Sequence, residues 1–285
     1  MRAHPGEVAV QRRNGVTHDR GSARTRPEIP EVAAAFLGAQ RMIVIGAADE
    51  LGRLWASVLT GPAGFATAAG ERTIVLRALP GAGDPLHGLF ESERDLGLLA
   101  IEPHTRRRMR VNGRAVRDGD TLVVRTEQVY ANCPKYIQTR EPTSAPGTPA
   151  VLGHGTTLDL RQSDLIAAAD TFFIATRAEG YGADVSHRGG NPGFVRVTGP
   201  RSLEFPDYPG NTMYMTLGNL ELDPAAGLLF PDWERGGTLQ LTGRARVEWG
   251  SEPVVRFELD AYVDRAGTLP AGWTAPGYHR FNPPV

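Results

Sequence analysis

The strongest constraint on this 285-residue chain is that its short motifs occur twice at one fixed spacing. Gly97-Leu98-Leu99 returns as Gly227-Leu228-Leu229, and Gly113-Arg114-Ala115 returns as Gly243-Arg244-Ala245. Both matches have the same offset along the chain, and Gly52/Gly182 and Gly88/Gly218 keep it. A constant spacing between repeated motifs indicates one structural unit present twice. The chain is therefore expected to fold as two similar halves.

Short apolar runs follow one another in the same order in both copies. Met109–Asn112 and Leu239–Thr242 alternate apolar with polar residues, which is typical of strands with one buried face. Many of the 34 glycines and 22 prolines separate such runs, as turns between strands require. About six strands are expected in each copy, with a short helix around 85–92 and another around 211–222. The pattern predicts a mainly β fold built from two small tandem barrels.

The repeats also set the expected domain limits. We predict an N-terminal arm over 1–31, a first repeat over 32–140, a linker over 141–162, a second repeat over 163–265 and a tail over 266–285. The linker is rich in Pro, Gly and Thr, as a boundary should be. Two similar barrels in one chain can pack as a pseudo-twofold pair, which mimics a homodimer inside one polypeptide. Whether whole chains pair further is left open.

Composition excludes several functional classes. The net charge of −1 gives no general basic field for nucleic acid. Cys133 is the single cysteine, so a disulfide framework and a cysteine-rich zinc site are excluded within the chain, and a cytoplasmic location is expected. The seven histidines show no ligand spacing, so we expect no metal site. No apolar run approaches the roughly 18 residues that a membrane helix needs.

The first thirty residues also lack the apolar stretch of a secretory signal. They are rich in arginine, but Glu7 and Asp19 argue against a transit peptide. We interpret them as a flexible or surface-wrapping arm.

One segment of the second copy has the residue types of an anion site. In Ser186–Gly190, Arg188 could hold phosphate oxygens through two N–H groups, and Gly189 and Gly190 could turn backbone N–H groups inward. Gly210-Asn211 stands where we expect a helix to begin, and free N–H groups at a helix N-terminus attract phosphate. Each feature has a plainer interpretation as well, a surface turn or a simple helix cap.

Further residues of the second copy extend this candidate site. Arg196 follows the glycine segment on a strand, and strand alternation leaves open which side it faces. Asn219 could reach a ligand from the helix, and Phe205-Pro206-Asp207 could line it. At the offset that relates Gly97 to Gly227, Arg188 matches Val58, Arg196 matches Ala66 and Asn219 matches Leu89. The first copy therefore lacks these groups, and one site per chain is expected.

The same stretch resembles a known family. Asp184–Val197, Phe205–Trp233 and Leu239–Val247 resemble the flavin-nucleotide-binding branch of the pyridoxamine 5'-phosphate oxidase-like split barrels. With Arg106–Ala115 and Gln128–Arg140 of the first copy, the resemblance extends over most of the chain. It implies split barrels of six strands with FMN bound at the interface between two of them. Some members of the family bind a deazaflavin, heme or no known cofactor instead.

The resemblance also implies which residues contact the cofactor. Residues late in one barrel reach the flavin held by the other, and here Lys135 and Arg140 would supply positive charge. Lys135 is the single lysine among 31 basic residues. The full set of expected FMN-binding residues is Ser186, Arg188, Gly189, Gly190, Arg196, Phe205, Pro206, Asp207, Gly210, Asn211, Asn219, Lys135 and Arg140.

Two nearby features are open to more than one interpretation. Cys133 is either a thiol facing the flavin or a small buried residue. The basic run Arg106–Arg110 is expected to be a solvated face, with a phosphate-bearing substrate as the alternative.

The expected activity is that of an FMN-dependent oxidoreductase with an unidentified small substrate. Hydride would move to or from the flavin N5, with NAD(P)H or a reduced organic molecule as donor. No side chain is identified as a general acid or base. The alternatives are a flavin-binding redox partner without turnover of its own and a split barrel that binds heme or a deazaflavin.

Overall fold

A computed structural model describes residues 3–16, 21–22 and 25–285 of the chain. The remaining residues, including Asp19 and other parts of the arm over 1–31, lie outside the described residues. No helix of the described part is long and apolar enough to cross a membrane.

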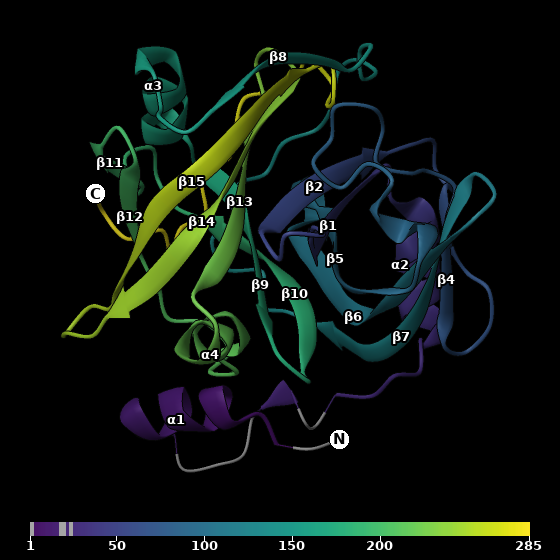
Figure 1. Ribbon diagram of the computed structural model, residues 1–285, viewed down its shortest axis with the longest axis horizontal. Coiled ribbons are helices and arrows are strands. Elements are labelled where there is room, and N and C mark those ends of the chain that lie inside the picture. The colour runs from purple at the N-terminus through teal and green to yellow at the C-terminus, as the bar shows by residue number, and fades with distance from the viewer. Residues whose placement is uncertain (1–2, 17–20, 23–24) are drawn as a thin grey trace.

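Two antiparallel sheets with the same strand order hold most of the chain (Figure 1). The first has the order β2-β1-β5-β6-β7-β4-β3, and the second has the order β10-β9-β13-β14-β15-β12-β11, with β8 paired to β15. The strands of the first sheet are β1 (Met42–Ala48), β2 (Leu54–Thr60), β3 (Ala66–Ala68), β4 (Thr73–Leu76), β5 (Arg94–Glu102), β6 (Arg107–Asp118) and β7 (Thr121–Ala131). Those of the second are β8 (Ala150–Gly155), β9 (Thr171–Ala178), β10 (Gly182–Gly189), β11 (Arg196–Gly199), β12 (Ser202–Pro206), β13 (Ala225–Asp232), β14 (Gly237–Glu248) and β15 (Val254–Ala266).

The mainly β fold with two tandem split barrels is confirmed. Each repeated set has seven strands rather than six, because β3 and β11 span only three and four residues and leave little pattern in the sequence. Helices α2 (Glu31–Ala39) and α3 (Leu160–Ala168), which we did not predict, open the two repeats. Around 85–92 the chain forms only a 3₁₀ turn, Leu89–Glu91, and α4 (Met215–Leu222) begins later than expected. Helix α1 (Pro5–Arg13) precedes the first repeat and lies beneath α4 (Figure 1).

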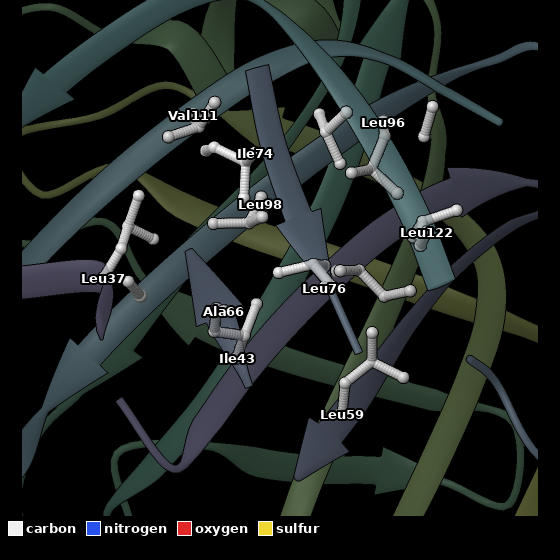
Figure 2. Packing of buried hydrophobic residues seen from close by; sticks show 14 of the residues in the cluster. Leu37, Ile43, Leu59, Ala66, Ile74, Leu76, Leu96, Leu98, Val111 and Leu122 are labelled. Carbon is white, nitrogen blue, oxygen red and sulfur yellow. The ribbon is translucent and has the colours of Figure 1, made fainter. Parts of the chain in front are cut away.

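Three apolar clusters hold these elements together. The first fills the barrel of the first repeat, where Ile74, Leu76, Leu96 and Leu98 converge (Figure 2). The second fills the other barrel and is centred on phenylalanines of β9, β12, β13 and β15. The third lies between the repeats and joins side chains of β1, β2 and β5 to those of β9, β10 and β13. The two barrels therefore share a buried interface within one chain.

The repeated glycines account for the closeness of this interface. A Cβ on Gly97 would lie 2.5 Å from the backbone carbonyl carbon of Asp184 in β10. A Cβ on Gly227 would lie 2.7 Å from the carbonyl oxygen of Leu54 in β2. Thus β5 packs on β10 and β13 packs on β2, which is the reciprocal contact that a twofold axis produces. Only glycine leaves room for backbones to approach this closely.

The second repeated motif marks a β-bulge. The pairing of β6 with β7 shifts between Asn112 and Gly113, and that of β14 with β15 shifts between Thr242 and Gly243. At both bulges a Cβ on the glycine would lie about 2 Å from a carbonyl oxygen of the partner strand. Both motifs found in the sequence therefore reflect backbone contacts of the fold.

We expect Gly227→Ala to destabilise the protein by roughly 1–3 kcal/mol, because its methyl group meets backbone that cannot rotate away. Urea unfolding measures this change. The matched control is Gly38→Ala in α2, where a Cβ has no neighbour within 4 Å. That substitution should leave stability unchanged or raise it by up to about 1 kcal/mol. Equal effects at both positions would refute the role given to Gly227.

Candidate functional site

A pocket between the two repeats gathers basic side chains from both. The first repeat contributes β6 and the segment that follows β7; the second contributes the end of β10, the loop over 206–214 and the start of α4. The lining residues are Arg108, Arg110, Asn132, Cys133, Lys135, Tyr136, His187, Arg188, Gly189, Phe194, Pro206, Asp207, Tyr208, Gly210, Asn211, Thr212, Met213, Tyr214, Met215, Thr216 and Leu217.

Arg110 is the most firmly held of these cations. It is 8% exposed, and its Nη1 donates to Asp184 Oδ2 at 3.1 Å. The Tyr130 hydroxyl donates to the same carboxylate at 3.1 Å, and the guanidinium lies over the Tyr130 ring. Asp184 therefore neutralises Arg110 and fixes its direction. Arg108 lies two residues earlier on β6, so it shares a side of that strand with Arg110.

Arg108 has no carboxylate partner among the described residues. Its Nη1 lies 2.9 Å from His187 Nδ1 and must donate, because a guanidinium has no acceptor. Burial, together with the charges of Arg110 and Arg188, lowers the pKa of Arg108 to about 9. Burial and the charges of Arg108, Arg188 and Arg110 lower the pKa of His187 well below its usual value. His187 is therefore neutral at pH 7, and its proton sits on Nε2.

Arg188 completes the charged part of the pocket. Its Nη2 lies 3.4 Å from Asp207 Oδ1, a weak contact for an ion pair. Burial lowers the pKa of Arg188 and raises that of Asp207. The Nε atoms of Arg108, Arg110 and Arg188 are buried without a hydrogen-bond partner.

Positive charge is therefore in excess here. Lys135 is a fourth cation, and it too has no carboxylate partner within the described residues; it lies 5.9 Å from the centre of the Phe281 ring. In the part of the chain that the structure describes, Asp184 and Asp207 are the carboxylates paired with members of this group of four cations. The arrangement attracts an anion, which would lower the cost of holding these cations out of water.

Aromatic side chains also line the pocket. Tyr136 and Tyr208 have ring centres 5.2 Å apart, and the Tyr136 hydroxyl donates to the Pro209 carbonyl at 3.0 Å. The pocket has a volume of about 90 Å³, below the roughly 300 Å³ at the lower end of small-molecule pockets. It therefore suits a small anion as it stands.

The structure brings about half of the residues that the sequence singled out to this pocket. Those that line it are Lys135, Arg188, Gly189, Pro206, Asp207, Gly210 and Asn211. Those that do not are Ser186, Gly190, Arg196, Phe205, Asn219 and Arg140.

The residues outside the pocket have other contacts. Ser186 is fully buried and shares a hydrogen bond with Thr216, while the Asn219 amide donates to Thr176. Phe205 packs in the core of the second barrel, and the Gly190 carbonyl accepts a hydrogen bond from Gln138 Nε2 at 3.1 Å. Arg140 forms a buried ion pair with Asp170 and stacks on Trp233. Arg196 is 70% exposed and bonds to Glu204, so alternation points it away from the pocket.

Local geometry differs from the sequence expectation at two points. Gly189 and Gly190 do not form a nest of free N–H groups: Gly189 belongs to β10, and the Gly190 N–H donates to the Asp170 carbonyl at 3.1 Å. A Cβ on Gly189 would lie 2.0 Å from the Tyr136 carbonyl oxygen, so the absence of a side chain here lets the backbone of the first repeat pack against β10. Asn211 does not cap a helix either, because Tyr214 occupies the N-cap of α4.

The two arginines that dominate the pocket lie outside the predicted set. The solvated-face interpretation of Arg106–Arg110 suits Arg107, which is exposed over Phe36. It is wrong for Arg110, which is buried, and Arg108 is half-buried and lines the pocket. The available signal was the spacing of two within a strand, which places Arg108 and Arg110 on one face. His187 and Tyr136 are further lining residues outside the predicted set.

The pseudo-twofold relation defines a counterpart to this pocket. The strand pairing shows which residues of β1 and β2 correspond to those of β9 and β10. For these strands the spacing between corresponding residues is shorter by a single residue than the spacing of the glycine motifs. Arg188 therefore corresponds to Leu59 rather than Val58, and Ser186 corresponds to Ser57. Arg196 likewise matches Thr67 rather than Ala66. On the other repeat, Thr238 and Gln240 stand where Arg108 and Arg110 stand here.

The counterpart is filled by an ion pair of the chain itself. Arg265 Nη1 donates to Asp84 Oδ2 at 2.6 Å, and both side chains are almost fully buried. Asp84 also accepts hydrogen bonds from the Ser57 hydroxyl and the Leu86 N–H. Burial raises the pKa of Asp84, against the opposing charge of Arg265. Asp84 thus neutralises Arg265 on this side of the interface. The position at Arg108 and Arg188 is the one of the two that is open to an external anion.

We expect Asp84→Ala to destabilise the protein by roughly 3–5 kcal/mol, because it leaves Arg265 buried and unpaired. Chemical denaturation at pH 7 measures the loss. Asp95→Ala is the matched control, since its side chain is 52% exposed in its pair with Arg114 and should cost less than about 1 kcal/mol. A loss at Asp84 no larger than at Asp95 would contradict the closed counterpart.

No family model matches this sequence, and no curated protein does. Solved structures are similar to it at low identity. A candidate pyridoxamine 5'-phosphate oxidase from Lactobacillus delbrueckii is 16% identical, over 39% of this chain and 97% of that one, with a TM-score of 0.32. HupZ from Group A Streptococcus is 14% identical, over 36% and 90%, with a TM-score of 0.31. The FAD binding protein of Mycobacterium smegmatis is 15% identical, over 39% and 98%, with a TM-score of 0.29. Several of the solved structures that are similar to this chain are described as candidate pyridoxamine 5'-phosphate oxidases or as flavin-binding proteins, and each matches about 40% of it.

Proposed function

We propose that this chain binds one FMN in the pocket between its repeats and exchanges electrons through it. The observation that supports this most is the excess of positive charge on Arg108, Arg110, Arg188 and Lys135 at that interface. The sequence resemblance supports the flavin part, since it implies FMN between two barrels. Both barrels contribute lining residues to this pocket.

The phosphate is the group that this charge suits best. Burial and the charge of Arg110 lower the pKa of both Arg108 and Arg188, and the charge of Arg188 lowers that of Arg108 further. A phosphate dianion would reverse that penalty and would engage N–H groups that have no partner in the protein. We therefore assign the phosphate to Arg108 and Arg188, with Arg110 held behind them by Asp184.

The ring system would lie against Tyr136 and Tyr208 after the loop over 207–214 moves outward. Bound FMN would supply hydride chemistry at its N5 atom, and the protein would supply position and charge. Lys135 would add a positive charge from the first repeat. The donor in our proposal is NAD(P)H or a small reduced organic molecule, and we name no catalytic acid or base. Flavin binding without NAD(P)H oxidation would favour a redox partner over an enzyme.

We expect inorganic phosphate to raise the melting temperature at pH 7, because it pairs with Arg108 in the folded state alone. Phosphate at ten times its dissociation constant should stabilise by roughly 1.4 kcal/mol, or about 2–4 °C. Arg108 is cationic below its pKa of about 9, so the effect should fade as the pH rises through that value. Differential scanning fluorimetry with chloride at equal ionic strength tests this, and a shift that persists unchanged at pH 10 would exclude Arg108 as the anion partner.

We expect Arg188→Ala to weaken FMN binding about 10- to 100-fold, since hydrogen bonds to a charged group contribute roughly 1.5–3 kcal/mol. Flavin fluorescence titration measures the dissociation constant. Arg196→Ala is the matched control, because Arg196 bonds to Glu204 outside the pocket, and it should bind like the parent. Parental affinity in Arg188→Ala would remove Arg188 from the site. A parent protein that binds no FMN would reject the proposed function.

A further inference from the structure

Helix α1 lies outside both repeats and is nevertheless packed tightly against α4 (Figure 1). A Cβ on Gly6 would lie 1.9 Å from the carbonyl oxygen of Gly218, and one on Gly218 would lie 2.6 Å from the Glu7 nitrogen. Two glycines therefore let the helix backbones touch. Glu7 is 1% exposed and accepts from the Ser22 N–H at 2.7 Å, which ties the segment after α1 back to it.

One polar side chain of α1 reaches the loop that lines the candidate pocket. Gln11 is 5% exposed, and its Nε2 donates to the carbonyl oxygens of Thr212 and Met213, each at 3.3 Å. A buried amide without partners is costly, so Gln11 favours the loop position that offers these two carbonyls. A side chain outside the pocket is thus bonded to the backbone of the pocket wall.

The bonded loop carries backbone strain. Thr212 has a φ of 61° and Tyr214 has a φ of 57°, both in the left-handed region that non-glycine residues rarely adopt. Tyr214 is the N-cap of α4 and makes no capping bond with its side chain. Such a conformation persists only where surrounding contacts impose it, and the bonds from Gln11 fall on Thr212 and on Met213 next to it.

The same loop supplies much of the pocket lining, so its outward movement would enlarge the pocket. The pocket volume of about 90 Å³ is too small for an aromatic ring system with a phosphate. Outward movement of 207–214 would stretch or break the bonds from Gln11 to Thr212 and Met213. The strength of those two bonds therefore enters the free energy of opening.

We propose that Gln11 is a positioning residue that latches the loop over 207–214, so that α1 controls ligand entry. This inference rests on the proposed function for the identity of the ligand. Removal of the latch speeds ligand entry and tightens binding, because the lost bonds stabilise the closed loop alone and the ligand occupies the open one.

The test compares Gln11→Met with the parent. Methionine keeps the length and bulk of the side chain and removes both donors. Hydrogen exchange without ligand should become about tenfold faster at the amides of 212–216 while the sheets stay protected. In stopped-flow fluorescence, the association rate of FMN should rise about tenfold and its dissociation rate should change little, so the affinity should rise by about the same factor. Arg12→Ala, an exposed residue of α1, is the control and should match the parent in every measurement.

Unchanged exchange at 212–216 in Gln11→Met would overturn the latch, and so would faster exchange spread evenly over both sheets. If Gln11→Met does not fold, Gln11→Glu replaces it, since its carboxylate faces the two carbonyl oxygens and should open the loop further at neutral pH. Exchange is measured without FMN, so it decides the latch even if the parent binds no flavin. Failure of FMN binding alone would reject the proposed function and leave the latch decided by exchange.

Discussion

The reciprocal packing of the two repeats is the contact on which the rest of the structure depends. Strand β5 lies on β10 and β13 lies on β2, and each contact needs a glycine, Gly97 or Gly227, where the backbones meet. This closeness brings β6 of the first repeat alongside the end of β10 of the second. Arg108 can therefore bond to His187, and Arg110 to Asp184, across the repeats. The candidate pocket is a consequence of the interface rather than of either barrel alone.

The two related sides of the interface differ in their balance of charge. On one side, four cations face two carboxylates, and several guanidinium N–H groups have no partner. On the other side, Thr238 and Gln240 replace the two arginines of β6, and Asp84 neutralises Arg265 inside the protein. A duplicated chain can vary its two copies independently, whereas a homodimer cannot. The asymmetry supports a single ligand per chain, and the glycines preserve the symmetric framework around it.

The fold was predictable from the sequence because its repeats lie at positions where the backbone tolerates only glycine. Gly97 and Gly113 mark close packing and a bulge, and both recur at the same spacing. Short elements such as β3 and α2 escaped prediction, since a strand this short or a helix of few turns leaves no clear period. The offset of the glycine motifs also failed for the early strands, where an intervening loop differs in length between the copies.

The candidate site was predictable only in part. Arg188 and Lys135 were found from residue type and position, and both line the pocket. Arg108 and Arg110 were placed on a solvated face, because a run of arginines does not reveal that the partner barrel covers one side of the strand. Asn219 and Phe205 were included for their place in the motif, although tertiary packing buries them. Long-range packing decides which face of a strand contacts the other repeat. The pattern of neighbouring residues in the sequence does not contain this information.

Of the two related positions in the chain, only the one at Arg108 and Arg188 is expected to bind an external anion. Native mass spectrometry of the protein titrated with FMN measures the number of ligands per chain directly. We expect saturation at one FMN per 285-residue chain. At a fixed FMN concentration, a smaller fraction of Arg188→Ala chains than of parent chains should carry FMN. Saturation at two would show that the Asp84–Arg265 side is open, and the absence of any bound FMN would contradict the assignment of the pocket.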